Sequence, residues 1–206
     1  MRRWFAALLG PGRPPIVDRD GLERFLAGEA AFVAQKTMVE YCRARAGTNW
    51  DKLFAESVFR DALTIGRLRA YGAVLAAMVA VVARELAGSV SDGGPASRAA
   101  LLALFDRLID RDATQLPAAE IAALRLGLDA RLVTPGAAPD LDSLATEAGH
   151  ALFQALPLHR DLIRYDRELL VNGVRMGMIG FYDRLRVRID ARALTRDLAG
   201  AGAPVD

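Results

Sequence analysis

Cysteine is nearly absent from this chain of 206 residues, because Cys42 is the only one. One cysteine excludes an intramolecular disulfide framework. A chain of this length buries roughly 70% of the surface that its unfolded form exposes, so it folds without such a framework. A lone thiol among apolar neighbours is typical of proteins from a reducing compartment. We therefore expect a cytoplasmic protein in which Cys42 is buried and inert.

An excess of charge of one sign is also lacking. The chain carries 27 basic and 25 acidic residues, a net charge of +2, and its only lysines are Lys36 and Lys52. The arginines are interleaved with acids, as in Asp166-Arg167-Glu168, which is typical of solvated, salt-bridged helix faces. Nucleic-acid binders concentrate Arg and Lys on one face, and no compact basic helix-turn-helix unit opens the chain. We expect no nucleic-acid partner.

Long apolar runs are missing as well. The longest, Ala70 to Ala83, has fourteen residues, whereas a membrane-spanning helix needs about 20. The run is therefore interpreted as a helix that is buried on all sides. Hydrophobic residues nevertheless make up 52% of the chain, and its mean hydropathy is +0.17. Three explanations stay open: a large core, an interface between subunits, or contact with lipid.

Helical periodicity is the pattern that the chain does have. Apolar residues recur at three- and four-residue spacing, and no stretch shows sustained alternation with period two. The sequence predicts an all-α fold with no sheet, as a single compact domain of about six to eight helices over residues 16–199. Residues 1–15 are predicted to form a short N-terminal amphipathic segment with a proline-rich linker, and residues 200–206 a disordered tail.

Several helix ends carry clear local signals. A helix from Leu22 to Arg45 is expected to end at Gly47, because glycine is the usual residue at that position. Asp140 is expected to cap the start of a later helix with its side chain. The last long helix is predicted to span about Leu158 to Arg188.

The middle of the chain is predicted to contain a break. An unbroken helix from Lys52 to Ala87 would be about 54 Å long at 1.5 Å per residue. That is long for a compact domain, and Gly66 and Gly72 lie within it. We therefore expect a bend or break near one of these glycines.

Motifs for catalysis or cofactors are weak. Glu147-Ala-Gly-His150 has the Glu-x-x-His spacing of di-iron bundles, but such bundles need two of these pairs, and His159 has no glutamate three residues before it. The serines of Gly88-Ser-Val-Ser-Asp-Gly93 lie in a turn-rich stretch rather than in a strand-to-helix elbow. No phosphate loop, paired zinc ligands or dinucleotide fingerprint occurs. We assign no catalytic residue, metal or cofactor, and the sequence leans against an enzyme without excluding one.

The first ten residues place two arginines before a short apolar stretch that contains Trp4, Phe5, Leu8 and Leu9. As a short helix, this stretch would insert these four side chains into a membrane surface. The alternative is that they pack on the protein's own core or on a second subunit. A secretory signal is not predicted, because the apolar part is only about seven residues long and a proline-rich linker follows it.

The segment Leu169–Tyr182 is the most informative stretch. It is apolar on two sides and contains three glycines, each of which costs about 1 kcal/mol relative to alanine inside a helix. Such glycines indicate close approach of another backbone or of a ligand. In one interpretation Arg175 holds the acidic head group of a hydrophobic ligand; in the other, Arg175 pairs with a carboxylate such as Glu85. The candidate ligand-binding residues are Arg175, Asn172, Gly173, Met176, Gly177, Tyr71 and Tyr182.

Three functions stay open. The first is a non-enzymatic adaptor, assembly factor or regulator that acts through apolar helix surfaces, as a homodimer. The second is a binder of a lipid-like or other hydrophobic small ligand between residues 70–86 and 169–182. The third is an enzyme with an unrecognised site near Tyr71, Arg175 and Tyr182. The partners expected are a second copy, another protein or a hydrophobic ligand, with weak contact to a membrane surface as a further alternative.

Overall fold

The computed structural model describes residues 14–89, 95–133 and 140–200. Helices account for 87% of these residues, and no strand or sheet occurs among them. The predicted all-α class is therefore confirmed. An isolated parallel bridge joins Ile16 to Ile189 and ties the start of the described chain to the end of the bundle. The amphipathic character of residues 1–13 and the disorder of residues 201–206 lie outside the described residues and stay predictions.

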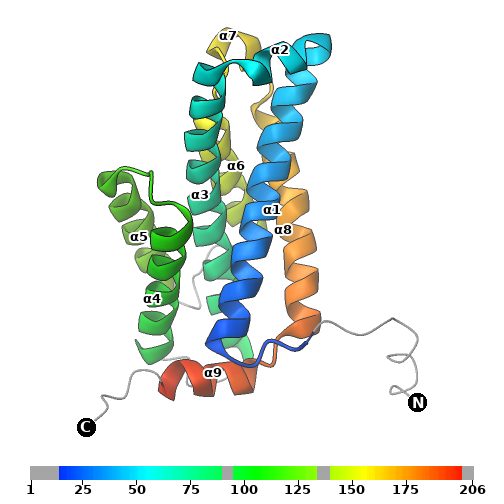
Figure 1. Cartoon of the computed structure of the whole chain (residues 1–206). Coiled ribbons are helices and arrows are strands. Elements are labelled where there is room, and N and C mark those ends of the chain that lie inside the picture. Colours follow the sequence, from blue (N-terminus) through cyan, green and yellow to red (C-terminus); the bar gives the residue numbers. More distant parts are fainter. Residues whose placement is uncertain (1–13, 90–94, 134–139, 201–206) are drawn as a thin grey trace, which may run out of the picture.

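Four helices form an up-down-up-down bundle (Figure 1). They are α1 (Arg19–Ala46), α3 (Ser57–Ser89), α6 (Leu141–Ala155) and α8 (Arg167–Arg188). Helix α1 packs on α3 and α8, and α6 packs on the same two helices from the other side. As a result α3 and α8 face each other diagonally across the core. The core side chains include Leu26, Met38, Leu75, Met78 and Phe181, each fully buried.

A helical hairpin is inserted between α3 and α6. It consists of α4 (Pro95–Asp112) and α5 (Ala118–Leu132), and both helices pack on the outer side of α3 (Figure 1). Its side chains Leu104, Phe105 and Leu128 are completely buried there. Helix α9 (Ala191–Gly200) crosses the end of the bundle and contacts α1, α3 and α4. The hairpin therefore covers the side of α3 that the bundle leaves open.

Of the bend or break predicted near Gly66 or Gly72, the break is wrong, because α3 runs without interruption through both glycines. A Cβ atom at position 66 would lie 2.4 Å from the Ala155 carbonyl oxygen, and one at position 72 would lie 2.8 Å from Cδ1 of Leu124. These glycines let neighbouring helices come close. The chain breaks instead at Glu56, whose extended backbone separates α2 (Trp50–Ala55) from α3.

The helix ends agree with the local signals in most places. Gly47 follows α1 with φ +55°, and its N–H donates to the Arg43 carbonyl. A Cβ is strained in this left-handed region, which explains the glycine. Asp140 caps α6 by accepting from the Ser143 N–H at 2.7 Å. The 3₁₀ turn Gly47–Asn49 leads into α2.

The last predicted helix is divided. A four-residue helix, α7 (Arg160–Ile163), is followed by a turn over residues 164–166, and α8 begins only at Arg167. The predicted end at Arg188 is correct.

Helix α3 is long and contains a strongly apolar stretch. In those ranges it is the one helix that is long and apolar enough to cross a membrane, and 78% of its most apolar stretch is buried inside the protein. The central helix of a water-soluble fold has the same properties.

Candidate functional site

Helix α8 has two apolar faces, and only one of them is covered. Leu170, Val174, Met178 and Phe181 point into the bundle and are buried. Leu169 and Met176 point outward and remain 62% and 68% exposed. Helices α1 and α6 cover the inner face, and no described element packs over the outer one. The outer face of α8 is therefore an exposed apolar stripe.

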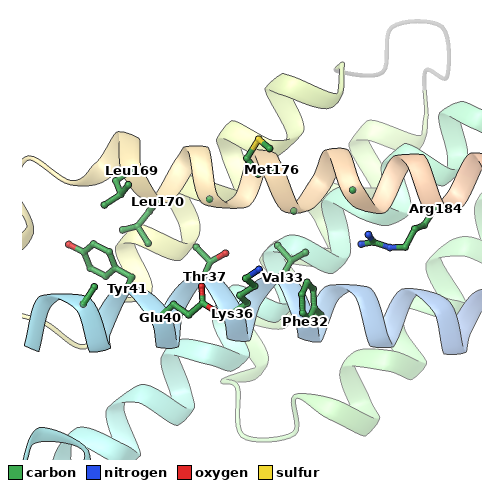
Figure 2. A pocket seen from close by; sticks show the side chains of 14 residues that line it. Phe32, Val33, Lys36, Thr37, Glu40, Tyr41, Leu169, Leu170, Met176 and Arg184 are labelled. Atoms are coloured by element: carbon green, nitrogen blue, oxygen red, sulfur yellow. The ribbon is translucent and has the colours of Figure 1, made fainter. Parts of the chain in front are cut away.

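This stripe forms one wall of a groove between α8 and α1, and Figure 2 shows the side chains of both helices along it. The groove has a volume of about 440 Å³. Phe32, which is 55% exposed, lies on the α1 wall of the groove. The apolar lining includes Phe32, Val33, Tyr41, Leu169, Leu170 and Met176.

Two glycines of α8 bring the floor of the groove close to α1. A Cβ atom at position 177 would lie 2.8 Å from the methyl groups of Val33, and one at position 173 would lie 3.1 Å from Cγ2 of Thr37. Such distances leave no room for a larger side chain without a shift of α1 or α8. The glycines thus serve close helix packing, and they line the groove as well.

Ionic contacts hold α1 and α8 together at both ends of the groove. Near Gly180, Arg184 donates to Glu29 through Nε at 2.8 Å and through Nη2 at 2.5 Å. These hydrogen bonds raise the pKa of the Arg184 guanidinium above its usual value. At the opposite end the Tyr41 hydroxyl donates to Asp166 at 2.7 Å, and Arg45 pairs with the same carboxylate at 3.0 Å. The two helices therefore form a firmly connected frame.

Arg175 and Asn172 lie outside the groove, on the side of α8 that faces α6. Arg175 forms an ion pair with Asp142, donates to Asn172, and reaches Thr146 at 3.3 Å. The carboxylate that meets Arg175 is thus Asp142 and not Glu85. Since this guanidinium is engaged by α6, it does not face an occupant of the groove.

Neither of the two candidate tyrosines lines the groove, and each donates to a different carboxylate. Tyr71 of α3 donates to Asp112 at 2.9 Å, beside a separate hollow of about 360 Å³ between α1 and α3. Burial is the main cause that raises the pKa of its phenol. Tyr182 donates to Glu85 at 3.2 Å, with Arg84 and Arg186 over its ring. Because α3 and α8 are diagonal, the groove lies between α1 and α8 and not between residues 70–86 and 169–182.

The α1 wall was missed by reasoning from sequence. Ala31, Ala34, Met38 and Tyr41 define the apolar stripe of α1, and Phe32 falls beside that stripe rather than on it. One signal was available: Phe32 precedes Lys36 by four residues, and the Lys36 ammonium lies 5.4 Å from the centre of the Phe32 ring. A large aromatic on the polar side of a helix marks a contact surface.

Other chemistry-bearing groups are few. Cys42 is buried, and burial raises its pKa to about 12, so its thiol is protonated and unreactive. Glu147 pairs with Arg131, and His150 is exposed. Within the described residues, no three His, Cys, Asp or Glu side chains come together as metal ligands would. No family model, curated protein or solved structure matches this chain.

Proposed function

We propose that this chain is a non-enzymatic interaction protein that binds an apolar helix of a partner in the groove between α1 and α8. The observation that carries the proposal is the uncovered apolar face of α8 beside the exposed Phe32 ring. Contiguous exposed apolar surface in a folded chain marks sites of interaction. Two antiparallel helices with a furrow between them form a common receptor for an amphipathic helix.

The shape of the groove favours a helix over a small ligand. From Leu169 to Arg184 the groove follows α8 for about 22 Å, the length of a helix of about 15 residues. Small-molecule sites bury 70–90% of their ligand. Here Phe32, Leu169 and Met176 are each more than half exposed, so a small hydrophobic ligand would stay largely in water. The lipid-like ligand expected from the sequence is the less supported alternative.

The polar groups of the groove would orient a bound helix, and they form no catalytic arrangement. Arg184 is already paired with Glu29. Lys36 lies over the Phe32 ring, and Glu40 makes no ion pair with another described residue. A partner helix would fit the groove if its apolar stripe packed on the apolar lining and if one of its basic residues paired with Glu40. A homodimer and a cytoplasmic location remain parts of this proposal, and native mass spectrometry would report the subunit number.

A displayed library of helical peptides tests the proposal. Peptides of about 15 residues, with apolar side chains at positions i, i+3, i+4 and i+7, are selected against the intact chain. We expect selected peptides to lose at least about tenfold in affinity on Met176→Glu or Phe32→Glu, since a buried charge costs more than 1.4 kcal/mol. Leu126→Glu, at an equally exposed position on α5, is the matched control and should change nothing.

A selection that yields no peptide, or only peptides that bind the Met176→Glu chain equally well, contradicts the proposal. The melting temperature of each variant is measured alongside. Because Met176 and Phe32 are exposed, both variants should melt like the wild type, and loss of binding then reports on the groove itself.

A further inference from the structure

We infer that the chain's own N-terminal stretch occupies the groove: residues 2–9 lie along it as a short helix, with Trp4, Phe5, Leu8 and Leu9 toward α8 and α1. This inference rests on the proposed function of the groove as a helix receptor. It adds the identity of one occupant, which belongs to the same chain and competes with the partner.

The chain enters the described part of the protein at the foot of the groove. The Pro14 carbonyl accepts from the Arg188 guanidinium at 3.2 and 3.3 Å. Two residues later, the Ile16 N–H donates to the Arg188 carbonyl at 2.8 Å, and the Ile16 carbonyl accepts from the Asp190 N–H at 3.0 Å. Residue 14 is therefore fixed at the end of α8, one helical turn beyond Arg184, which lines the groove.

The length of the preceding chain matches the distance to be covered. From Arg188 back to Gly180 is eight residues of α8, or about 12 Å. Four residues, 10–13, span at most about 13 Å when fully extended. The next eight residues toward the N-terminus, as a helix, add about 12 Å. Leu9 then lies near Gly180, and Arg2 near Gly173, so the apolar side chains fall over the middle of the groove.

The chemistry of the stretch matches the groove. Trp4 and Leu8, and Phe5 and Leu9, are four residues apart and share a side of a helix. Gly10 follows the last of them, where helices commonly end. The basic end of the stretch, Arg2 and Arg3 with the positive helix N-terminus, is brought toward Glu40, whose carboxylate makes no ion pair with another described residue.

A segment of the same chain is favoured over a second copy or a membrane. A tether as short as residues 10–13 holds the stretch at an effective concentration on the order of 1 mM beside the groove. One helix of this length, bound in a second copy, buries far less than the roughly 800 Å² per partner of a stable interface. An isolated helix of this length is marginal in water, so it forms on docking.

Tryptophan fluorescence tests the inference, because the chain has two tryptophans. Trp50 packs edge-on against Phe54 and under Arg43, and Trp50→Phe keeps an aromatic ring there while leaving Trp4 as the sole tryptophan. In this full-length variant we expect Trp4 emission to be blue-shifted from that of tryptophan in water, and shielded from acrylamide. Adding Met176→Glu should shift the emission to the red and expose Trp4, and adding Leu126→Glu should not.

Each other outcome overturns the inference. Trp4 with the emission of tryptophan in water leaves the groove empty. Shielding that Met176→Glu does not change places Trp4 elsewhere. Shielding that disappears on dilution shows docking into a second copy. Shielding that appears only with vesicles of phosphatidylserine and phosphatidylcholine shows a membrane contact.

A second measurement separates this inference from the function it rests on. Phe5→Asp with Leu9→Asp in the full chain should raise the affinity for the selected helical peptides about tenfold, by freeing a groove that is otherwise about 90% occupied. Equal affinity for the two chains overturns the competing occupant and leaves the helix receptor intact. A chain with both substitutions that binds no peptide overturns the receptor itself.

Discussion

Helices α3 and α8 are both apolar on more than one side, yet the fold treats them differently. Around α3 stand α1, α4, α5 and α6, and nearly every residue from Ala70 to Val82 is buried. Around α8 stand mainly α1 and α6, and Leu169 and Met176 remain in solvent. The same kind of sequence thus gives a core helix in one place and a helix with one exposed apolar face in the other.

The helical hairpin accounts for the difference. Helices α4 and α5 follow α3 in the chain and fold back onto its outer face, where Leu104, Phe105 and Leu128 are fully buried. In the described part of the chain, α8 has no such cover. An exposed apolar face lowers solubility and contributes no folding energy, and this is the observation that supports the proposed binding of a helix.

Three methionines measure this contrast directly. Met78 of α3 and Met178 of α8 are fully buried, whereas Met176 is 68% exposed. We expect Met78→Ala and Met178→Ala each to lower the free energy of unfolding by about 2–5 kcal/mol, through lost burial and the cavity left behind. In the Phe5→Asp, Leu9→Asp chain, whose groove is free of the N-terminal stretch, Met176→Ala should change it by less than about 0.5 kcal/mol.

Urea unfolding of the three variants provides the measurement. A loss of more than about 1 kcal/mol from Met176→Ala in the Phe5→Asp, Leu9→Asp chain would mean that something other than the N-terminal stretch covers the outer face of α8, and would break the contrast between its two faces. A loss that occurs only in the wild-type background identifies the cover as the N-terminal stretch.

Local signals predicted much of the fold. The caps at Gly47 and Asp140 are interactions within a few residues of each other, so the sequence alone locates them. The break at Glu56 was missed, and a bend or break was expected near Gly66 or Gly72 instead. The role of Gly66 depends on Ala155, almost 90 residues later in the chain. No local pattern specifies whether a glycine ends a helix or admits a neighbour.

The candidate site was predicted in part for the same reason. Periodicity places Gly173, Met176 and Gly177 on one side of α8, and the groove contains all three. Arg175 was placed with them because it is close in sequence, yet it points toward Asp142 of α6. Periodicity tells which residues share a face, but which helix covers that face is decided by the topology of the bundle.

The floor of the groove provides the second prediction. Gly177→Leu forces a side chain into the methyl groups of Val33, which a Cβ alone would approach to 2.8 Å. We expect a loss of about 1–3 kcal/mol in the free energy of unfolding. Gly28→Leu, in the interior of α1 with open space around it, should instead gain up to about 1 kcal/mol, because leucine is the better helix former.

Equal effects of the two leucines in urea unfolding would show that Gly177 does not bring α1 and α8 together. The close packing of α8 against α1, which forms the floor of the groove, would then be contradicted.

The buried hydroxyl of Tyr71 on α3 should contribute more to stability than the Arg175 guanidinium on α8, and Tyr71→Phe tests the first half of this comparison. Its side chain is buried and its hydroxyl donates to Asp112. Tyr71→Phe should cost about 0.5–1.5 kcal/mol near neutral pH, the net value of one hydrogen bond. Calorimetry or urea unfolding over a range of pH provides the measurement.

The pH dependence has a defined sign. Hydrogen bonds from Arg111 and then Tyr71 lower the pKa of Asp112. The contribution of Asp112 to the free energy of unfolding is therefore present above about pH 4 and is lost as the pH falls further. Burial raises the pKa of Tyr71, so its contribution is present below about pH 10 and is lost at higher pH. The difference between wild type and Tyr71→Phe should be a plateau that declines at both ends. A difference that does not vary with pH contradicts the contact.

Arg175 on α8 tests the other half and has the smallest expected effect. If its partner were a buried acid, Arg175→Met would cost about 3–5 kcal/mol, because the acid would be left without compensation. The Asp142 side chain is 65% exposed, so water replaces the guanidinium and the expected cost is about 0–1 kcal/mol. Arg184→Met is the matched comparison on the same helix: its partner Glu29 is only 12% exposed, and the loss should be larger.

Because Arg175 faces α6 and not the groove, Arg175→Met should also leave the affinity for the selected helical peptides unchanged. Unfolding in urea and peptide titration of the two variants check both statements, and a loss of peptide binding in Arg175→Met would move the site from the α1 side of α8 to its α6 side.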